Sequence, residues 1–235
     1  MITCGVCGTE NDEYAVLCAS CKAYLQSKVE GLDLFATIWG LIESPTATFR
    51  RIVLSKRKNF VTLLAAVAGI AVVFGIIWFF RMGTRFTGLM SILAFGMIGG
   101  PIAGIVTMLT VSTLVQVAAR IAGGKGRFRD TMAATTYASF PVGFSLIFIF
   151  PLLIANFGMY LFDQNPSPMV IKPVVYSALL LFDVAAVLWA LGLSIIGLAV
   201  AHRLPRTRAV LVGLIFPILV GAAGLWLKST GMPGT

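Results

Sequence analysis

The amino-acid sequence predicts an all-α polytopic membrane protein with five transmembrane helices and a small, cysteine-rich N-terminal head. Three observations predict this class: a very apolar composition, long uncharged runs, and four cysteines gathered near the start of the chain. Hydrophobic residues make up 58% of the 235 residues and charged residues 11%, whereas soluble domains carry about 45–50% and about 25%. This composition excludes a soluble globular domain, a disordered chain and a collagen-like repeat.

The head comprises residues 1–30 and holds two Cys-x-x-Cys pairs separated by ten residues. Its four cysteines are Cys4, Cys7, Cys18 and Cys21. Each pair can present two thiolates from one tight turn, and two such turns complete a tetrahedron, so we expect a zinc ribbon with one structural Zn²⁺ per chain. We expect Gly5 and Gly8 to supply the backbone freedom of the first turn. The alternatives are two disulfides, which a reducing cytoplasm disfavours, and a redox-active pair, which the second pair leaves unexplained.

The head has two candidate roles. Because it is too small for a hydrophobic core, it is either a knob that only the metal keeps folded or a docking module for a cytoplasmic protein. Nucleic-acid binding is not expected, because acids outnumber its two basic residues, Lys22 and Lys28. The start of the chain has no basic region followed by an apolar core, so we expect the head to stay on the side where it is made.

Residues 31–58 are expected to form amphipathic helices on the membrane surface. Apolar residues recur there at helical spacing, at Leu32, Phe35, Ile38, Trp39 and Ile42. The dipeptide Ser44-Pro45 is typical of an N-cap followed by the first residue of a second helix. The sequence therefore predicts two short helices ahead of the first span.

Basic residues gather around the second surface helix and in a later loop. They are Arg50, Arg51, Lys56, Arg57, Lys58, Lys125, Arg127 and Arg129. Each can add about 1 kcal/mol of attraction to an anionic leaflet. Two interpretations stay open: an ordinary positively charged flank packed on the bundle, or a surface that binds anionic lipid headgroups or a partner protein.

The membrane domain, residues 59–228, carries five apolar runs with the length of about 20 residues that a helix needs to cross the hydrocarbon core. The expected spans are 60–80, 89–119, 131–155, 173–201 and 209–227. We expect Pro101, which follows two glycines, to break the second span. Pro141 and Pro151 predict a strong kink or a re-entrant segment in the third. Residues 229–235 would form a short tail.

The basic residues also predict the orientation. With five spans, fourteen of the eighteen Lys and Arg residues lie on one side of the membrane and four on the other. The side richer in basic residues is cytoplasmic. We therefore expect an integral protein of the cytoplasmic (inner) membrane, with its N-terminus inside and its C-terminus outside.

Two features of the spans suggest how the bundle packs. Gly96, Gly100 and Gly104 repeat every four residues, which puts them on one helix face and lets another helix approach closely; a ligand groove at the glycines and Pro101 is the alternative. Asp183 is the single formal charge within the spans. We expect it to pair with Arg81, and a proton or substrate site is the alternative.

Enzyme signatures are missing from the sequence. Ser145 lacks the following glycine of a nucleophile elbow, and the sole histidine, His202, is expected in a basic cytoplasmic loop. A single intramembrane aspartate does not make an aspartyl protease. The chain is therefore not expected to be an enzyme.

Three short motifs together resemble a known family. They are Gly123-Gly124-Lys125-Gly126-Arg127-Phe128, Tyr137-Ala138-Ser139-Phe140-Pro141, and Ile42-Glu43-Ser44-Pro45-Thr46-Ala47-Thr48-Phe49. This combination, over about residues 32–228, resembles the Yip family of Ypt/Rab-interacting membrane proteins. The resemblance implies five spans with the N-terminus inside. Eukaryotic members bind small GTPases, but the zinc ribbon looks prokaryotic, so Rab binding is not carried over.

Two functions are compatible with these observations. The first is a non-catalytic scaffold or accessory subunit that recruits a cytoplasmic or membrane protein or organises the local bilayer through its anionic headgroups. The second is a small transporter or channel that uses the Gly/Pro-broken second span and Asp183. Because polar groups are scarce in the spans, the scaffold is favoured.

Overall fold

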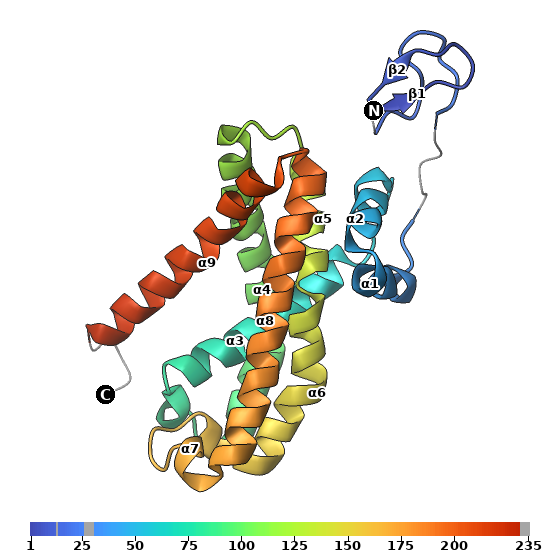
Figure 1. The fold of residues 1–235 in the computed structure, drawn as a ribbon. Coiled ribbons are helices and arrows are strands. Elements are labelled where there is room, and N and C mark those ends of the chain that lie inside the picture. Colours follow the sequence, from blue (N-terminus) through green and yellow to red (C-terminus); the bar gives the residue numbers. More distant parts are fainter. Residues whose placement is uncertain (13, 26–30, 231–235) are drawn as a thin grey trace.

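The computed structural model describes residues 1–12, 14–25 and 31–230. Figure 1 shows a bundle of long helices with a small head beside one end. The head contains two short antiparallel strands, β1 (Ile2–Thr3) and β2 (Glu10–Asn11), in which Ile2 lies opposite Asn11. An isolated bridge between Leu17 and Tyr24 marks a second hairpin.

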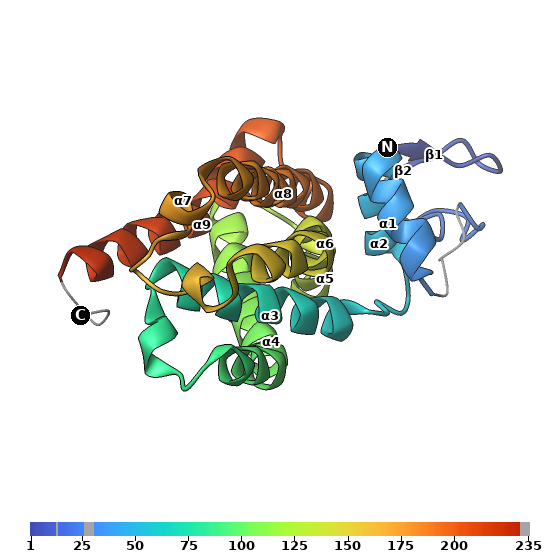
Figure 2. The ribbon, with the colours of Figure 1, turned by 90° about the horizontal axis from the view of Figure 1, so that it is seen from below.

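Two surface helices precede the bundle, α1 (Leu34–Glu43) and α2 (Pro45–Leu54). The carboxylate of Asp33 caps α1 by accepting a hydrogen bond of 2.7 Å from the backbone N–H of Ala36. Figure 2 shows both helices on one side of the bundle. They are anchored there by the buried Phe49, whose ring lies over Gly197 so closely that a Cβ at that position would approach it within 2.9 Å.

In the described residues, the bundle has five long helices joined by short segments. A shorter helix directly precedes one of the five. In chain order these are α3 (Val61–Phe79), η1 (Met82–Arg85), α4 (Leu89–Ile121), α5 (Phe128–Ala138), α6 (Phe140–Phe157), η2 (Gly158–Leu161), α7 (Pro168–Ile171), α8 (Pro173–His202) and α9 (Arg206–Ser229). Among the described residues, four segments are long and apolar enough to cross a membrane. They are Val61–Phe79, Leu89–Ile121, Phe128–Leu161 and Pro173–His202. The protein is therefore a helical membrane protein.

The fifth expected span, 209–227, falls within α9, a helix of 24 residues. Figure 1 shows α9 leaving the end of α8 and slanting away from the rest of the bundle. Its N-terminal part packs against α4 and α8 through the buried Ala209 and Val212. That α9 crosses the membrane stays a prediction.

The third expected span is built from two helices, α5 and α6, that meet at Ser139. Pro141, in the first turn of α6, has no N–H to donate, and its ring collides with the carbonyl four residues earlier in a continuous helix. The proline therefore explains a break between Ala138 and Phe140. Pro151 lies inside α6, which continues through it.

The second expected span, in contrast, is not broken at Pro101. The helix α4 runs without interruption from Leu89 to Ile121. A proline removes one hydrogen bond from a helix, and the close packing of α4 on α3 on both sides of Pro101 offsets that loss. The expected break is therefore wrong.

Three glycines of α4 bring its backbone against α3. A Cβ at Gly96 would lie 2.3 Å from the ring of Phe74, and one at Gly104 would lie 2.1 Å from the carbonyl oxygen of Ala65. A Cβ at Gly100 would lie 2.6 Å from the Cα of Ile70. No side chain fits at these positions, so the glycines line a helix contact and not a groove.

Candidate metal centre and cationic cavity

The four cysteines of the head form one cluster. Their sulfur atoms all lie within 4.8 Å of one another, with Sγ–Sγ distances of 3.6 Å between Cys4 and Cys21 and 3.5 Å between Cys7 and Cys18. In a tetrahedral site with metal–sulfur bonds of about 2.3 Å, neighbouring sulfurs lie about 3.8 Å apart. None of the four cysteines forms a disulfide. The four sulfur donors and their spacing therefore fit one tetrahedral metal ion. Each of the two measured distances joins a cysteine of the first Cys-x-x-Cys pair to a cysteine of the second.

Two matching backbone turns present these sulfurs. The N–H of Gly8 donates to the carbonyl of Cys4 at 2.9 Å, and the N–H of Lys22 donates to the carbonyl of Cys18 at 3.1 Å. Both residues that follow a pair are left-handed, with φ of +71° at Gly8 and +59° at Lys22. Gly8 suits this conformation, whereas Gly5 has ordinary φ and open space around it. The expected need for glycine therefore holds at Gly8 and is wrong at Gly5.

Asn11 is a further residue of the metal centre that the cysteine pattern does not reveal. Its side chain is buried, donates to the carbonyl of Thr9 at 2.7 Å and lies 3.5 Å from the sulfur of Cys18. Its Oδ1 accepts from the N–H of Ala19 at 2.8 Å. One amide thus joins the two cysteine turns and stabilises negative charge on a sulfur.

The head contacts the membrane domain through two neighbouring residues. The hydroxyl of Tyr14 donates to the carbonyl of Val200 in α8 at 3.0 Å, and Asp12 forms an ion pair with Arg203 at the end of the same helix. The Arg203 guanidinium also lies over the Tyr14 ring, 4.6 Å from its centroid. The pKa of Asp12 lies below its ordinary value. The main cause is the hydrogen bond that its carboxylate accepts from the N–H of Tyr14, and the smaller cause is its pairing with Arg203. The cysteine cluster is therefore fixed at one end of the bundle.

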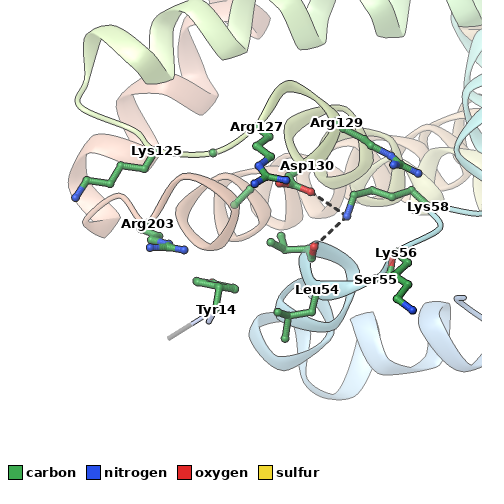
Figure 3. A pocket seen from close by; sticks show the side chains of 13 residues that line it. Tyr14, Leu54, Ser55, Lys56, Lys58, Lys125, Arg127, Arg129, Asp130 and Arg203 are labelled. Carbon is green, nitrogen blue, oxygen red and sulfur yellow. Dashed lines mark hydrogen bonds and ion pairs between the residues drawn. The ribbon is translucent and has the colours of Figure 1, made fainter. Parts of the chain in front are cut away.

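Beside this contact lies a cavity of about 390 Å³, which we call the cationic cavity. Figure 3 shows it between α2, the start of α5, the end of α8 and the head residue Tyr14. One carboxylate, Asp130, and six cationic side chains line it. The six are Lys56, Lys58, Lys125, Arg127, Arg129 and Arg203.

Lys58 and Asp130 form the buried link of this cavity. Their charged atoms are 2.9 Å apart, and their side chains are 6% and 16% exposed. The other contacts of the Lys58 ammonium are the carbonyls of Ile52 and Val53, at 2.6 and 3.1 Å, so it also caps the last turn of α2. Burial lowers the pKa of Lys58, and Asp130 opposes that shift.

Residues 123–126, which we call the glycine-rich loop, have glycine at the positions that lie against a buried histidine. His202 is fully buried and is the last residue of α8, so the expectation that it belongs to the loop after the fourth span is wrong. A Cβ at Gly124 would lie 2.7 Å from His202 Nδ1, and one at Gly126 would lie 2.6 Å from the carbonyl of Ala201. The N–H of Lys125 donates to the carbonyl of His202 at 3.1 Å. The loop thus lies flat on the end of α8.

Side chains of α4 and α5 complete this contact. Gln116 and Arg120 each donate to the carbonyl of Gly126 at 3.1 Å, and Thr131 contacts both Gln116 and His202 Nε2. Because the loop is held at both sides, the start of α5 is fixed. Arg127 and Arg129 are therefore presented at the rim of the cationic cavity.

The eight basic residues expected on one surface are divided by the structure. Lys56, Lys58, Lys125, Arg127 and Arg129 line the cationic cavity. Arg50, Arg51 and Arg57 are not among its lining residues, although Arg50 lies 5.8 Å from the centroid of the Tyr14 ring. Sequence reasoning missed Arg203 and Tyr14 because only the fold brings the end of α8 to the head.

Asp183 and Arg81 are not brought together. The carboxylate of Asp183 accepts a hydrogen bond of 2.6 Å from Ser145 of α6, and it lines an apolar cavity of about 370 Å³. Arg81 donates to the carbonyl of Leu161 at 3.0 Å, and its guanidinium lies 5.7 Å from the centroid of the Trp78 ring. The expected ion pair is therefore wrong: the carboxylate of Asp183 is bound to Ser145, and the guanidinium of Arg81 is bound to the carbonyl of Leu161.

Comparison with known proteins gives one match. No curated protein and no solved structure matches the chain. The family model of the Yip1 domain matches residues 39–227, which is most of the chain and includes the surface helix α2, the glycine-rich loop and all the long helices. The chain therefore belongs to the Yip1 domain family, with a four-cysteine head ahead of the matched region.

Proposed function

We propose that the protein is a non-catalytic membrane scaffold or accessory subunit whose head recruits a protein partner to the membrane. The contact of Tyr14 and Asp12 with the end of α8 carries this proposal. A partner bound to a freely tethered head would only be kept near the membrane, whereas a partner bound to a docked head has a fixed orientation. Membership of a family of membrane proteins without known catalysis supports the non-catalytic role.

The ion in the head is proposed to be Zn²⁺. Cys4, Cys7, Cys18 and Cys21 would hold it, and its role would be structural because four thiolates leave no open position for a substrate. Soft thiolates and a tetrahedral spacing favour zinc over hard cations. The chemistry that the ion supplies is charge neutralisation and cross-linking of the two turns, which otherwise lack a shared apolar core.

The proposed topology has five spans, the N-terminus in the cytoplasm and the C-terminus outside, in the cytoplasmic (inner) membrane. Support comes from the excess of basic residues on the side of the head and from the length of α9. Single cysteines at Ser27 and Ser229, in a chain without its native cysteines, test it with a membrane-impermeant maleimide on intact cells. Labelling at 229 alone is expected, and labelling at 27 alone would overturn the topology.

The scaffold is tested by purification from native membranes in mild detergent. Proteins that co-purify with the wild type are compared with those that co-purify with Cys18→Ser, and each candidate is then purified and mixed with the full chain. We expect one partner to bind the zinc-loaded chain at equimolar ratio and to be released when the metal is chelated. Binding of every candidate to the wild type and to Cys18→Ser alike would refute recruitment by the head.

A transporter is the second candidate, and the cavity beside Asp183 and Ser145 is the observation that favours it. The second span does not contribute, because its glycines are covered by α3. The test is proton- or ion-dependent flux in liposomes with wild type and Asp183→Asn. Flux that Asp183→Asn abolishes at unchanged stability would favour the transporter over the scaffold.

A further inference from the structure

We infer that the cationic cavity binds the phosphate group of an anionic lipid headgroup at the surface of the bilayer. The ligands would be the guanidinium groups of Arg127 and Arg129 together with the ammonium group of Lys125, which also lines the cavity. This inference rests on the placement of α1 and α2 at the membrane surface that the sequence predicts, and it is independent of partner recruitment by the head.

The cavity has more positive charges than its one carboxylate can balance. Asp130 is the one carboxylate of the lining, and it is bound to Lys58, whose ammonium also contacts two backbone carbonyls. This pair is internally neutral. In the described part of the chain, no carboxylate lies within 4.0 Å of the charged nitrogens of Lys125, Arg127 or Arg129. The cavity therefore carries several positive charges that attract an anion.

Arg127 and Arg129 lie at the N-terminal end of the helix α5. Arg127 is the N-cap residue of α5, and no side chain caps that end. The first N–H groups of a helix and its dipole favour a phosphate there. Asp130, the acid of the first turn, is bound to Lys58. One guanidinium group can donate two parallel hydrogen bonds to phosphate oxygens, so Arg127 and Arg129 can each add directional contacts to the charge.

Exposed apolar side chains on α1 favour a lipid over a soluble phosphate as the ligand. Phe35, Trp39 and Ile42 lie along one face of α1 and are 82%, 62% and 47% exposed. An exposed aromatic face on a surface helix is suited to the boundary between headgroups and acyl chains. The next helix, α2, lines the cavity with Val53 and Leu54. The cavity is thus lined by a helix that packs on the helix with this exposed apolar face, which acyl chains can cover and which a soluble anion does not need.

The test uses the purified full chain with its metal in a neutral detergent. It is titrated with dioctanoyl phosphatidic acid, dioctanoyl phosphatidylcholine or inorganic phosphate, and native mass spectrometry measures the bound fraction. We expect one phosphatidic acid per chain, bound about tenfold more tightly than phosphatidylcholine. The combined change Arg127→Gln and Arg129→Gln should weaken phosphatidic acid binding about tenfold.

The matched control combines Arg51→Gln with Arg57→Gln, which removes the same amount of charge from α2 and the segment that follows it, at residues outside the lining. Its affinity should stay within about twofold of the wild type. If the first double variant does not fold, Lys125→Gln, an exposed single change, should still weaken binding about threefold.

Three results would overturn the inference. Equal weakening by the two double variants would mean general surface attraction. Equal binding of phosphatidic acid and phosphatidylcholine would mean that the cavity does not distinguish an anionic headgroup from one without net charge. Inorganic phosphate binding as tightly as phosphatidic acid would assign the cavity to a soluble anion. None of these results affects recruitment of a protein by the head, which is measured separately.

Discussion

The head and the membrane domain bury very different side chains. Among the described residues of the head, Cys4, Asn11 and Cys18 are the buried ones, and two of these are metal-ligand candidates. The membrane domain buries three clusters of apolar side chains and packs α3 on α4 through glycines. A metal ion held by the four cysteines would take the place of a core in the head, whereas the bundle has apolar cores of its own.

The two regions meet where polar contacts are concentrated. Asp12 and Tyr14 of the head contact α8, and Lys58 joins α2 to α5 close by. These contacts belong to neither the metal centre nor the apolar core. Variants in each of the three places therefore separate what the metal stabilises from what packing stabilises.

The largest effect on the membrane domain is expected from its buried ion pair. Lys58→Met leaves Asp130 without its counter-charge and removes the two hydrogen bonds that Lys58 donates to carbonyls of α2, so the free energy of unfolding should fall by about 3–5 kcal/mol. Unfolding in detergent by a denaturant series measures this. The control Arg57→Met, on an exposed neighbour, should change it by less than about 0.5 kcal/mol. Equal losses in both variants would refute a special role for Lys58.

A smaller effect is expected where α3 and α4 touch. Gly104→Ala places a Cβ 2.1 Å from the carbonyl oxygen of Ala65 and should destabilise the bundle by about 1–3 kcal/mol. Gly99→Ala, in the same helix with open space around it, should be neutral or stabilising by up to about 1 kcal/mol. The melting temperatures of the two variants distinguish these outcomes, and a harmless Gly104→Ala would contradict the close approach.

A double-mutant cycle tests the partner of Asp183. Ser145→Ala and Asp183→Ala each remove one side of a hydrogen bond, so they should couple by about 0.5–1.5 kcal/mol. Arg81→Gln and Asp183→Ala should add to within about 0.5 kcal/mol, because the two groups have other partners. Coupling of Asp183 to Arg81 and not to Ser145 would restore the ion pair that the sequence suggested.

The smallest effect is expected at the contact between the two regions. Asp12→Asn keeps an oxygen for the N–H of Tyr14 but removes the charge that pairs with Arg203, so docking of the head should weaken by less than about 1 kcal/mol. The N–H of Tyr14 within the head lowers the pKa of Asp12 most, and Arg203 lowers it further in the docked state. The Arg203 contribution to docking is therefore fully present above the ordinary pKa of an aspartate and is lost as the pH falls from there through the lowered pKa.

Hydrogen exchange of the peptide that contains Tyr14 reports this docking. In the wild type, protection should fall on acidification through the range in which Asp12 is protonated, while in Asp12→Asn the same step should be missing. An identical pH profile in both proteins would mean that another group controls the contact.

The sequence predicted best what is local or repetitive. The four cysteines are spaced within two turns, and the spans are long apolar runs, so neither depends on distant residues. Long-range pairs were mispredicted or missed. Arg81 follows the first expected span and Asp183 lies in the half of the fourth span nearer the same side of the membrane, which suggested the pair, but the sequence pattern contains nothing about Ser145 on a neighbouring helix. The role of Arg203 depends on where the chain places the end of α8 relative to the head.

Proline and histidine show a second limit. Pro101 and Pro141 are both apolar-span prolines, but only the second coincides with a helix break, because packing on α3 supports the first. His202 is followed by Arg203, Arg206 and Arg208 in sequence and is nevertheless buried under the glycine-rich loop. Local composition does not report whether the rest of the bundle covers a residue.

The central claim is that one metal ion keeps the head folded and docked while the bundle folds without it. Hydrogen exchange measured by mass spectrometry across the whole chain, before and after chelation and again after one equivalent of Zn²⁺, tests it in one experiment. Chelation should remove protection from the cysteine turns and from the Tyr14 peptide, leave α3 to α8 unchanged, and be reversed by zinc. A head that stays protected without metal, or a bundle that loses protection with it, would contradict the claim.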